Sequence, residues 1–418
     1  MKNLTEEEFE TLQHGIAYLK ENFCCYSDYS VSDFDVPDEY HDEIGAEEIF
    51  SLLTPEGDGV DEIKYIDFIE IFPEITSLKI SNNEKISTSN RTYLIASTED
   101  EYELYQLSLQ EIKVSLKNGI EISFAHEDIV VGFAAIKSGE YNVDYRPPLS
   151  AYSAILIDFT NSSIRLSQQE ELSLSKSFMF EVAFMTGIPL HFSRMQAPDT
   201  AWPDDHDYDF DSNIPLLETF NPGMEMFLSA TAIREQELKY LIFYKILEHF
   251  GPIALKMEGF ELMRKKLDLA PYHANDADFI NSVFELSDSI KSRYNDRELI
   301  ESTITNSIDC IGIFNKLPVS IQKKLKIELK VREINYSISS ENKKSLIRVL
   351  SRILYATRNM VVHAKANFTR TGDECDLKDL EGLNLFLRFA SAQTIKWYNR
   401  LPEQFRLSKV EEKINKKA

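Results

Sequence analysis

The stretch that decides the fold of the second half of the chain is SSENKKSLIRVLSRILYATRNMVVHAKANF, residues 339–368. On a wheel of 100° per residue, its apolar positions fall within an arc of about 100°. This stripe comprises Leu346, Leu350, Ile353, Leu354, Thr357, Val361 and Ala364. The pattern predicts an amphipathic helix that packs one face into a helical domain.

Three polar residues near the end of this helix raise a functional question. Asn359 and His363 fall opposite the apolar stripe, roughly 40° apart, and Arg358 falls at the edge of the stripe. A solvated polar face explains this arrangement as well as a catalytic set does. Both interpretations remain open on the spacing alone.

The residue types suit RNA cleavage without a metal. Histidine titrates near neutral pH and can deprotonate a 2′-hydroxyl, which then attacks the adjacent phosphorus. Arginine can bind two phosphate oxygens and offset the charge of the transition state. Arg358 and His363 lie about 140° apart on an ideal helix, so one helix directs both at one phosphate only if the helix distorts or the long Arg side chain swings round. We expect a second copy of the chain, related by a two-fold axis, to complete the site.

The rest of the chain predicts an α+β protein: a strand-rich domain at residues 1–200, an acidic linker at 201–221, a helical domain at 222–404 and a charged tail at 405–418. A capped helix is expected at 5–22. Short β-rich runs predict strands within 91–98, 102–116, 119–125, 128–136 and 151–159, followed by a helix at 167–187. In the second half, the Gly251–Pro252 pair predicts the end of a helix within residues 223–252.

Charge divides the chain in the same way. The net charge is −24, but residues 1–221 hold 43 acidic and 13 basic residues, whereas residues 222–418 hold 26 acidic and 32 basic residues. An acidic first half is a poor phosphate binder, and the basic second half is a better one. The basic run at 323–332 is a candidate RNA-phosphate track, although a solvated helix face explains it too. Its residues are Lys323, Lys324, Lys326, Lys330 and Arg332.

Other motifs give weaker signals. The alternating acids of DDHDYDFD, residues 204–211, could hold a divalent cation, but a solvated acidic linker is the more common explanation. The loop at 54–68 imitates a calcium-binding loop, but Tyr65 stands where the bidentate Glu belongs. The four cysteines show no metal-ligand or disulfide spacing, so packing is the expected role. We therefore predict no metal and no cofactor.

The string RNMVVHA, residues 358–364, resembles the Arg-x4-6-His motif of the HEPN superfamily, and most closely its ApeA-like group. ELKYLIFYKILEHFGP, residues 237–252, also resembles the opening helix of that group. Ala364 stands where the group has glycine. The resemblance covers roughly residues 222–404.

The resemblance implies a helical bundle, a face-to-face homodimer and a metal-independent endoribonuclease. His363 would be the acid/base, Arg358 the phosphate ligand and Asn359 the positioning residue, with Glu248 in weak support. The family implies a toxin that cleaves RNA, such as tRNA, in antiviral defence or abortive infection, with the N-terminal domain sensing a phage or cellular trigger or restraining the nuclease. The alternative is a non-catalytic dimerisation scaffold whose N-terminal domain binds a protein or nucleic-acid partner. No apolar run approaches the ~18–20 residues that cross a bilayer, and the N-terminus is acidic, so we expect a cytoplasmic protein without membrane contact.

Overall fold

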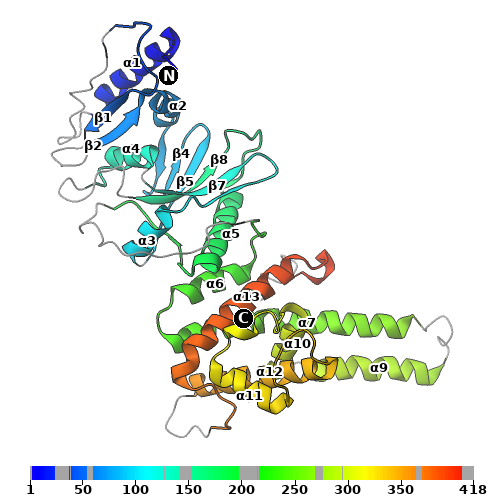
Figure 1. Ribbon diagram of the computed structural model, residues 1–418. Helices are drawn as coiled ribbons and strands as arrows, with labels where there is room; N and C mark the ends of the chain where they lie inside the picture. The colour runs from blue at the N-terminus through cyan, green and yellow to red at the C-terminus, as the bar shows by residue number, and fades with distance from the viewer. Residues whose placement is uncertain are drawn as a thin grey trace. The chain divides into compact units, whose positions relative to one another are not determined.

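The computed structural model describes the chain as two compact units, Met1–Leu217 and Glu218–Ala418. The boundary lies within the range expected for the linker. The first unit contains an antiparallel sheet with helices, and the second is almost entirely helical, which confirms the α+β class (Figure 1). The described residues are 2–23, 37, 39–53, 60–98, 100–126, 128–141, 152–196, 214, 216–268, 276–293, 295–363 and 370–406.

The first unit is built on a seven-stranded antiparallel sheet of order β3-β4-β5-β8-β7-β6, with β9 paired to β5. Its strands are β3 (Lys79–Ser81), β4 (Lys85–Ser87), β5 (Arg91–Ser97), β6 (Lys113–Ser115), β7 (Glu121–His126), β8 (Ser153–Asp158) and β9 (His191–Phe192). A separate ribbon pairs β1 (Ile49–Leu53) with β2 (Val60–Lys64). The central strand β5 has β8 on one side and, on the other side, β4 followed by β9.

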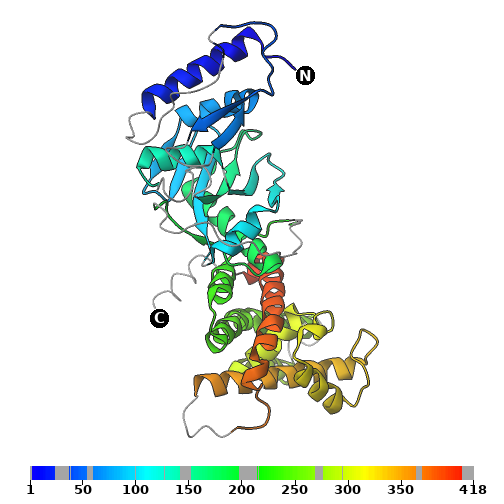
Figure 2. The ribbon, with the colours of Figure 1, turned by 60° about the vertical axis from the view of Figure 1, so that its left-hand side comes forward.

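Helices cover both faces of this sheet. Tyr93 and Ile95 of β5 enter the core formed with α1 (Glu6–Asn22), α2 (Tyr65–Thr76) and α4 (Ile129–Ser138). In Figure 2, α1 (dark blue) lies outside the other elements of this unit. Because side chains alternate along a strand, Thr92 faces the other way and donates to Glu171 of α5 (Gln168–Thr186) at 3.0 Å. The predicted helices at 5–22 and 167–187 are confirmed, each with a capping box at its start.

Two predictions of strands in this unit are wrong. Residues 129–138 form α4 because Asp128 caps its first turn, its side chain accepting from Val130 N at 2.9 Å, and Gly139 ends it with φ 74°. The helix is buried on nearly all sides, so its sequence shows no helical stripe. Residues 101–108 form α3 (Glu101–Ser108), and only 113–115 of the predicted strand 102–116 pair in the sheet.

The second unit packs its helices around α7. Its helices are α6 (Pro222–Ala232), α7 (Gln236–Leu267), α9 (Ala277–Ser292), α10 (Asp296–Ser307), α11 (Val319–Leu329), α12 (Ser340–Val362) and α13 (Leu380–Asn399), with short 3-10 turns η1 (Phe314–Lys316), η2 (Leu377–Asp379) and η3 (Glu403–Phe405). The first part of α7 contacts α6, α10, α12 and α13, whereas its last turns run beside α9 to form an arm (Figure 1). Phe260 in these last turns also packs on Phe405 of η3. Among the described residues, no helix combines the length and apolar character that crossing a bilayer requires.

The predicted helix end at Gly251–Pro252 is also wrong, because α7 continues through both residues to Leu267. Pro252 carries no N–H, so the carbonyl of Glu248 loses its i+4 donor at this point. Gly251 serves packing instead: a Cβ there would lie 2.9 Å from Leu299 Cβ of α10. Close approach lets Thr303 of α10 donate its hydroxyl to the Leu247 carbonyl at 3.0 Å.

Candidate active site

The helix α12 fixes the positions of the three predicted catalytic residues. Ser339 caps its start by accepting from Asn342 N at 3.2 Å. The predicted apolar stripe is buried from Leu346 to Thr357, while Val361 is half-buried, Met360 is buried in its place and Ala364 lies outside the described residues. The Thr357 hydroxyl accepts from Cys375 N at 2.9 Å, which ties the segment after the site to the helix.

Arg358 is half-buried and turned toward neighbouring polar groups. Its guanidinium donates to the Asn359 side-chain oxygen at 3.2 Å. It also lies close enough to Tyr240, Tyr244 and Glu248 of α7 to favour their ionised forms. Arg358 and Asn359 are therefore a coupled pair at the contact between α12 and α7. Glu248, which the sequence offers only as weak support for the site, lies close enough to Arg358 to sense its charge.

The environment of Glu248 disfavours its charge. Burial is the largest effect and raises the pKa of its carboxyl, Arg358 opposes the rise, and Asp296 at the start of α10 adds to it. The neighbouring Tyr244 is 1% exposed, and burial raises the pKa of its phenol well above the ordinary value, with Glu248 adding to the effect. A half-buried carboxyl with a raised pKa beside an arginine is a feature of sites that transfer protons.

Sequence reasoning missed Tyr244 and Asp296 as neighbours of the candidate site. Tyr240, Tyr244 and Glu248 are spaced i, i+4, i+8, so they form one stripe along α7. That spacing was available in the sequence and indicates a common facing surface. Asp296 could not be found in this way, because it comes from α10 and only the packing brings it near Glu248 and Tyr244.

His363 lies at the end of α12 and is exposed. It is the C-cap residue, with φ −105° and ψ 32°, and its N–H donates to the Asn359 carbonyl at 2.9 Å. Because the residue has left helical geometry, the wheel does not fix the direction of its ring. Within the described part of the chain, no hydrogen bond joins its side chain to Arg358 or Asn359. One copy thus presents the histidine to solvent and the arginine to α7.

The basic run at 323–332 does not form a uniform cationic surface. The Lys324 ammonium donates to the Asp373 carboxylate at 2.9 Å and to the Gly372 carbonyl at 2.8 Å. Lys326 lies 5.9 Å from the centre of the Phe314 ring. The remaining basic residues of the run are exposed: Lys323, Lys330 and Arg332. These three are the part of the predicted track that is accessible to a phosphate backbone.

The remaining motifs of the sequence offer no competing site in the described residues. The acidic run at 204–211, Cys24, Cys25 and residues 54–59 of the loop at 54–68 lie outside those residues. Within them, no group of three or more His, Cys, Asp or Glu side chains is arranged to hold a metal ion. Cys310 and Cys375 are free and buried, and burial raises the pKa of each thiol to about 12. Neither thiol is activated as a nucleophile.

The assignment of this site rests on the side chains and contacts described above. Arg358, Asn359 and Glu248 come together at the α7–α12 contact, and His363 stands exposed at the end of α12. Comparison of the chain with protein-family models, curated proteins and solved structures found no match.

Proposed function

We propose that the chain is a metal-independent endoribonuclease of the HEPN type. The observation that carries the proposal is the guanidinium of Arg358, which is half-buried and held by Asn359 beside Glu248 and Tyr244. A cation fixed in partly desolvated surroundings stabilises developing negative charge better than a freely moving surface cation does, because it does not reorganise during the reaction. The transition state of phosphodiester cleavage carries such charge.

The proposed reaction is transesterification of RNA. The 2′-oxygen attacks the phosphorus, the bond to the 5′-oxygen breaks and a cyclic phosphate forms. One base removes the 2′-hydroxyl proton and one acid protonates the leaving oxygen. His363, exposed at the end of α12, supplies one of these transfers, and the same residue of a second copy supplies the other. Asn359 holds Arg358 in place through the 3.2 Å hydrogen bond.

The biological role proposed with this activity is antiviral defence or abortive infection in the cytoplasm. A nuclease that cleaves cellular RNA must be restrained until a trigger appears. The separate N-terminal unit, with its strongly acidic composition, is the part of the chain proposed to sense the trigger or restrain the nuclease. The negative charge of this unit disfavours RNA binding, because it repels the negatively charged phosphates of RNA.

The test is cleavage of total RNA and of purified tRNA by wild type, His363→Ala and Arg358→Ala, each with and without EDTA. We expect His363→Ala to lose activity by about 10²–10⁴-fold and Arg358→Ala by about 10²–10³-fold. EDTA should leave the wild-type rate unchanged.

Arg358→Lys keeps the charge but loses the planar fork and should recover only part of the rate. His41→Ala, an exposed histidine of the other unit, is the matched control. Cleavage of RNA by His363→Ala at the wild-type rate would exclude the proposed mechanism.

A second candidate is a non-catalytic dimerisation scaffold, and the arm of α7 and α9 favours it. None of the described side chains of α9 is buried, and Phe284 is 66% exposed. Phe260, Leu262, Leu267 and Ile280 are exposed nearby. Residues 256–267 hold four basic and two acidic side chains, whereas 277–292 hold one basic and three acidic side chains. A two-fold axis that sets α7 of one copy against α9 of another would match these charges.

Expression in cells separates the two candidates. A nuclease is expected to be toxic, and Arg358→Ala should relieve the toxicity while the chain still dimerises. A scaffold is expected to be harmless with or without that substitution.

A further inference from the structure

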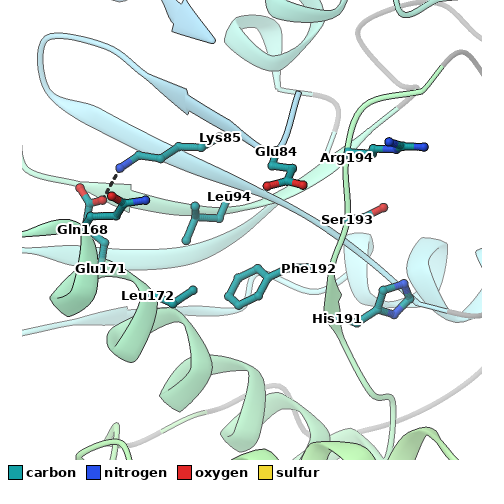
Figure 3. Close-up of a pocket in the computed structure, with 10 residues that line it drawn as sticks. All are labelled: Glu84, Lys85, Leu94, Gln168, Glu171, Leu172, His191, Phe192, Ser193 and Arg194. Atoms are coloured by element: carbon teal, nitrogen blue, oxygen red, sulfur yellow. Dashed lines mark hydrogen bonds and ion pairs between the residues drawn. The ribbon is translucent and has the colours of Figure 1, made fainter. Parts of the chain in front are cut away.

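A cavity in the first unit, distinct from the nuclease site, is built on one face of the sheet. The register sets Lys85 of β4 opposite Leu94 of β5, and Phe192 of β9 opposite Ala96. Because side chains alternate along strands, Lys85, Leu94 and Phe192 share the face that looks toward α5. The first turns of α5 cover that face only in part and leave a cavity of about 640 Å³ (Figure 3). This volume is within the usual range for small-molecule sites.

One wall of the cavity is a fixed and neutralised ion pair. Glu171 of α5 is only 7% exposed, and its carboxylate accepts from the Lys85 ammonium and from the Thr92 hydroxyl. Figure 3 marks the contact between Lys85 and Glu171 on the side of the cavity next to Gln168. Because Lys85 and Glu171 are paired and Glu171 is held by a further hydrogen bond, their positions are fixed before a ligand binds. The pair offers a ligand little net charge. This wall therefore supplies shape and hydrogen bonds.

The opposite part of the cavity combines an aromatic ring with a carboxylate. The Phe192 ring, Leu172 and Leu94 provide apolar surface there. The Glu84 carboxylate borders the same space and has no hydrogen bond or ion pair to another described side chain. An aromatic face beside an uncompensated carboxylate is a combination that attracts organic cations, through the ring quadrupole and direct charge attraction.

Arg194 is the charge that could favour an anion instead. It is exposed at the rim, and in Figure 3 its side chain is directed away from Lys85 and Glu171. Its effect is reduced further by the surrounding charge, because residues 1–221 carry 30 more acidic than basic residues. The field of the unit thus favours a positively charged ligand over a phosphate or a carboxylate.

We propose that this cavity binds an organic cation, an amine or guanidinium attached to an apolar body. The cationic group contacts Glu84, and the body packs on Phe192, Leu94 and Leu172. The site does not depend on the nuclease proposal, because every lining residue belongs to the first unit.

The test is calorimetric titration of the full chain with tryptamine, with indole-3-acetate as the probe of the same body and opposite charge, and with AMP as a phosphate-bearing probe. Tryptamine should bind saturably and the two anions at least tenfold more weakly. Glu84→Gln should weaken tryptamine binding about tenfold, because it removes the charge and keeps the size. Phe192→Leu should weaken it through loss of the ring. Glu70→Gln, an exposed acid outside the cavity, is the control.

Circular dichroism of each variant confirms that a loss of binding is not a loss of fold. Three outcomes would overturn the proposal: no saturable binding of tryptamine, equal or tighter binding of either anion, or unchanged affinity in the folded Glu84→Gln variant. Binding that falls equally in Glu70→Gln would overturn it as well, because it would reflect only the general charge of the unit.

Discussion

At the residue scale, Glu248 is the group whose ionisation is coupled most clearly to the candidate site. Burial raises the pKa of its carboxyl above the ordinary value of 4.5, against the opposing attraction of Arg358. The folded state therefore binds this proton more tightly than the unfolded state does. The contribution of the group to stability is fully present below pH 4.5 and is lost as the pH rises through the raised pKa.

Glu248→Gln should therefore stabilise the chain at pH 8 and leave its stability nearly unchanged at pH 4. We expect a difference of less than about 1 kcal/mol, because solvent partly screens a half-buried group. Urea unfolding at both pH values measures it, with Glu261→Gln, an exposed acid of the same helix, as the control. A less stable Glu248→Gln at pH 8 would show instead that Arg358 holds the carboxylate in its charged form.

The sequence indicates which side chains of α12 leave the buried stripe but not which residues of other helices they meet, and the reason is physical. The wheel separated Asn359 and His363 from the buried stripe because helical periodicity is local, and both are at least partly exposed. It could not show that Arg358 faces α7, because that contact joins residues more than a hundred positions apart. It also treated His363 as helical, whereas the helix ends at Val362.

At the scale of elements, the close packing of α7 on α10 depends on one glycine. In Gly251→Ala, the new Cβ would lie 2.9 Å from Leu299 Cβ and 3.3 Å from the Leu299 carbonyl oxygen, and neither atom belongs to a flexible end. We expect a loss of about 1–3 kcal/mol in the free energy of unfolding.

Gly259→Ala on the same helix is the matched comparison. Its Cβ would lie 3.1 Å from the Cδ1 and Cγ2 methyl groups of Ile290, farther than the 2.9 Å to Leu299 Cβ, so the strain is smaller. Both variants gain about 1 kcal/mol of helix propensity from alanine, so the difference between them measures the strain. Denaturant unfolding of both variants measures the contrast. Equal stability of the two variants would mean that α7 and α10 separate readily at Gly251, contrary to the packing described.

The same pair of helices explains an error of sequence reasoning. A glycine followed by a proline usually ends a helix. The helix α7 nevertheless continues through Gly251 and Pro252, because packing against α10 stabilises the helical conformation there. Residues 129–138 show the converse problem: burial on all sides hides the helical period, and only Asp128 and Gly139 at the two ends mark a helix. Strands with one clear register, such as β5 and β8, were predicted correctly.

At the scale of the whole molecule, the division of charge coincides with the division into two units. Residues 1–221 have a net charge of −30 and residues 222–418 a net charge of +6. Negative charge on one unit lowers the attraction of the other for a polyanion where the charges lie within screening range of one another. On the proposed function, we expect this negative charge to weaken RNA binding without any specific contact.

This restraint predicts that residues 218–418 alone cleave RNA faster than the full chain at low salt. The expected ratio is about tenfold or more near 0.1 M salt, where charges act over roughly 10 Å, and it should approach one near 1 M, where they act over roughly 3 Å. Cleavage of tRNA by both proteins across a salt series measures it. His363→Ala in the shorter chain controls for contaminating nuclease. A ratio that is large but independent of salt would mean that the first unit restrains the nuclease by direct contact, and a ratio of one at every salt concentration would mean that it does not restrain the nuclease.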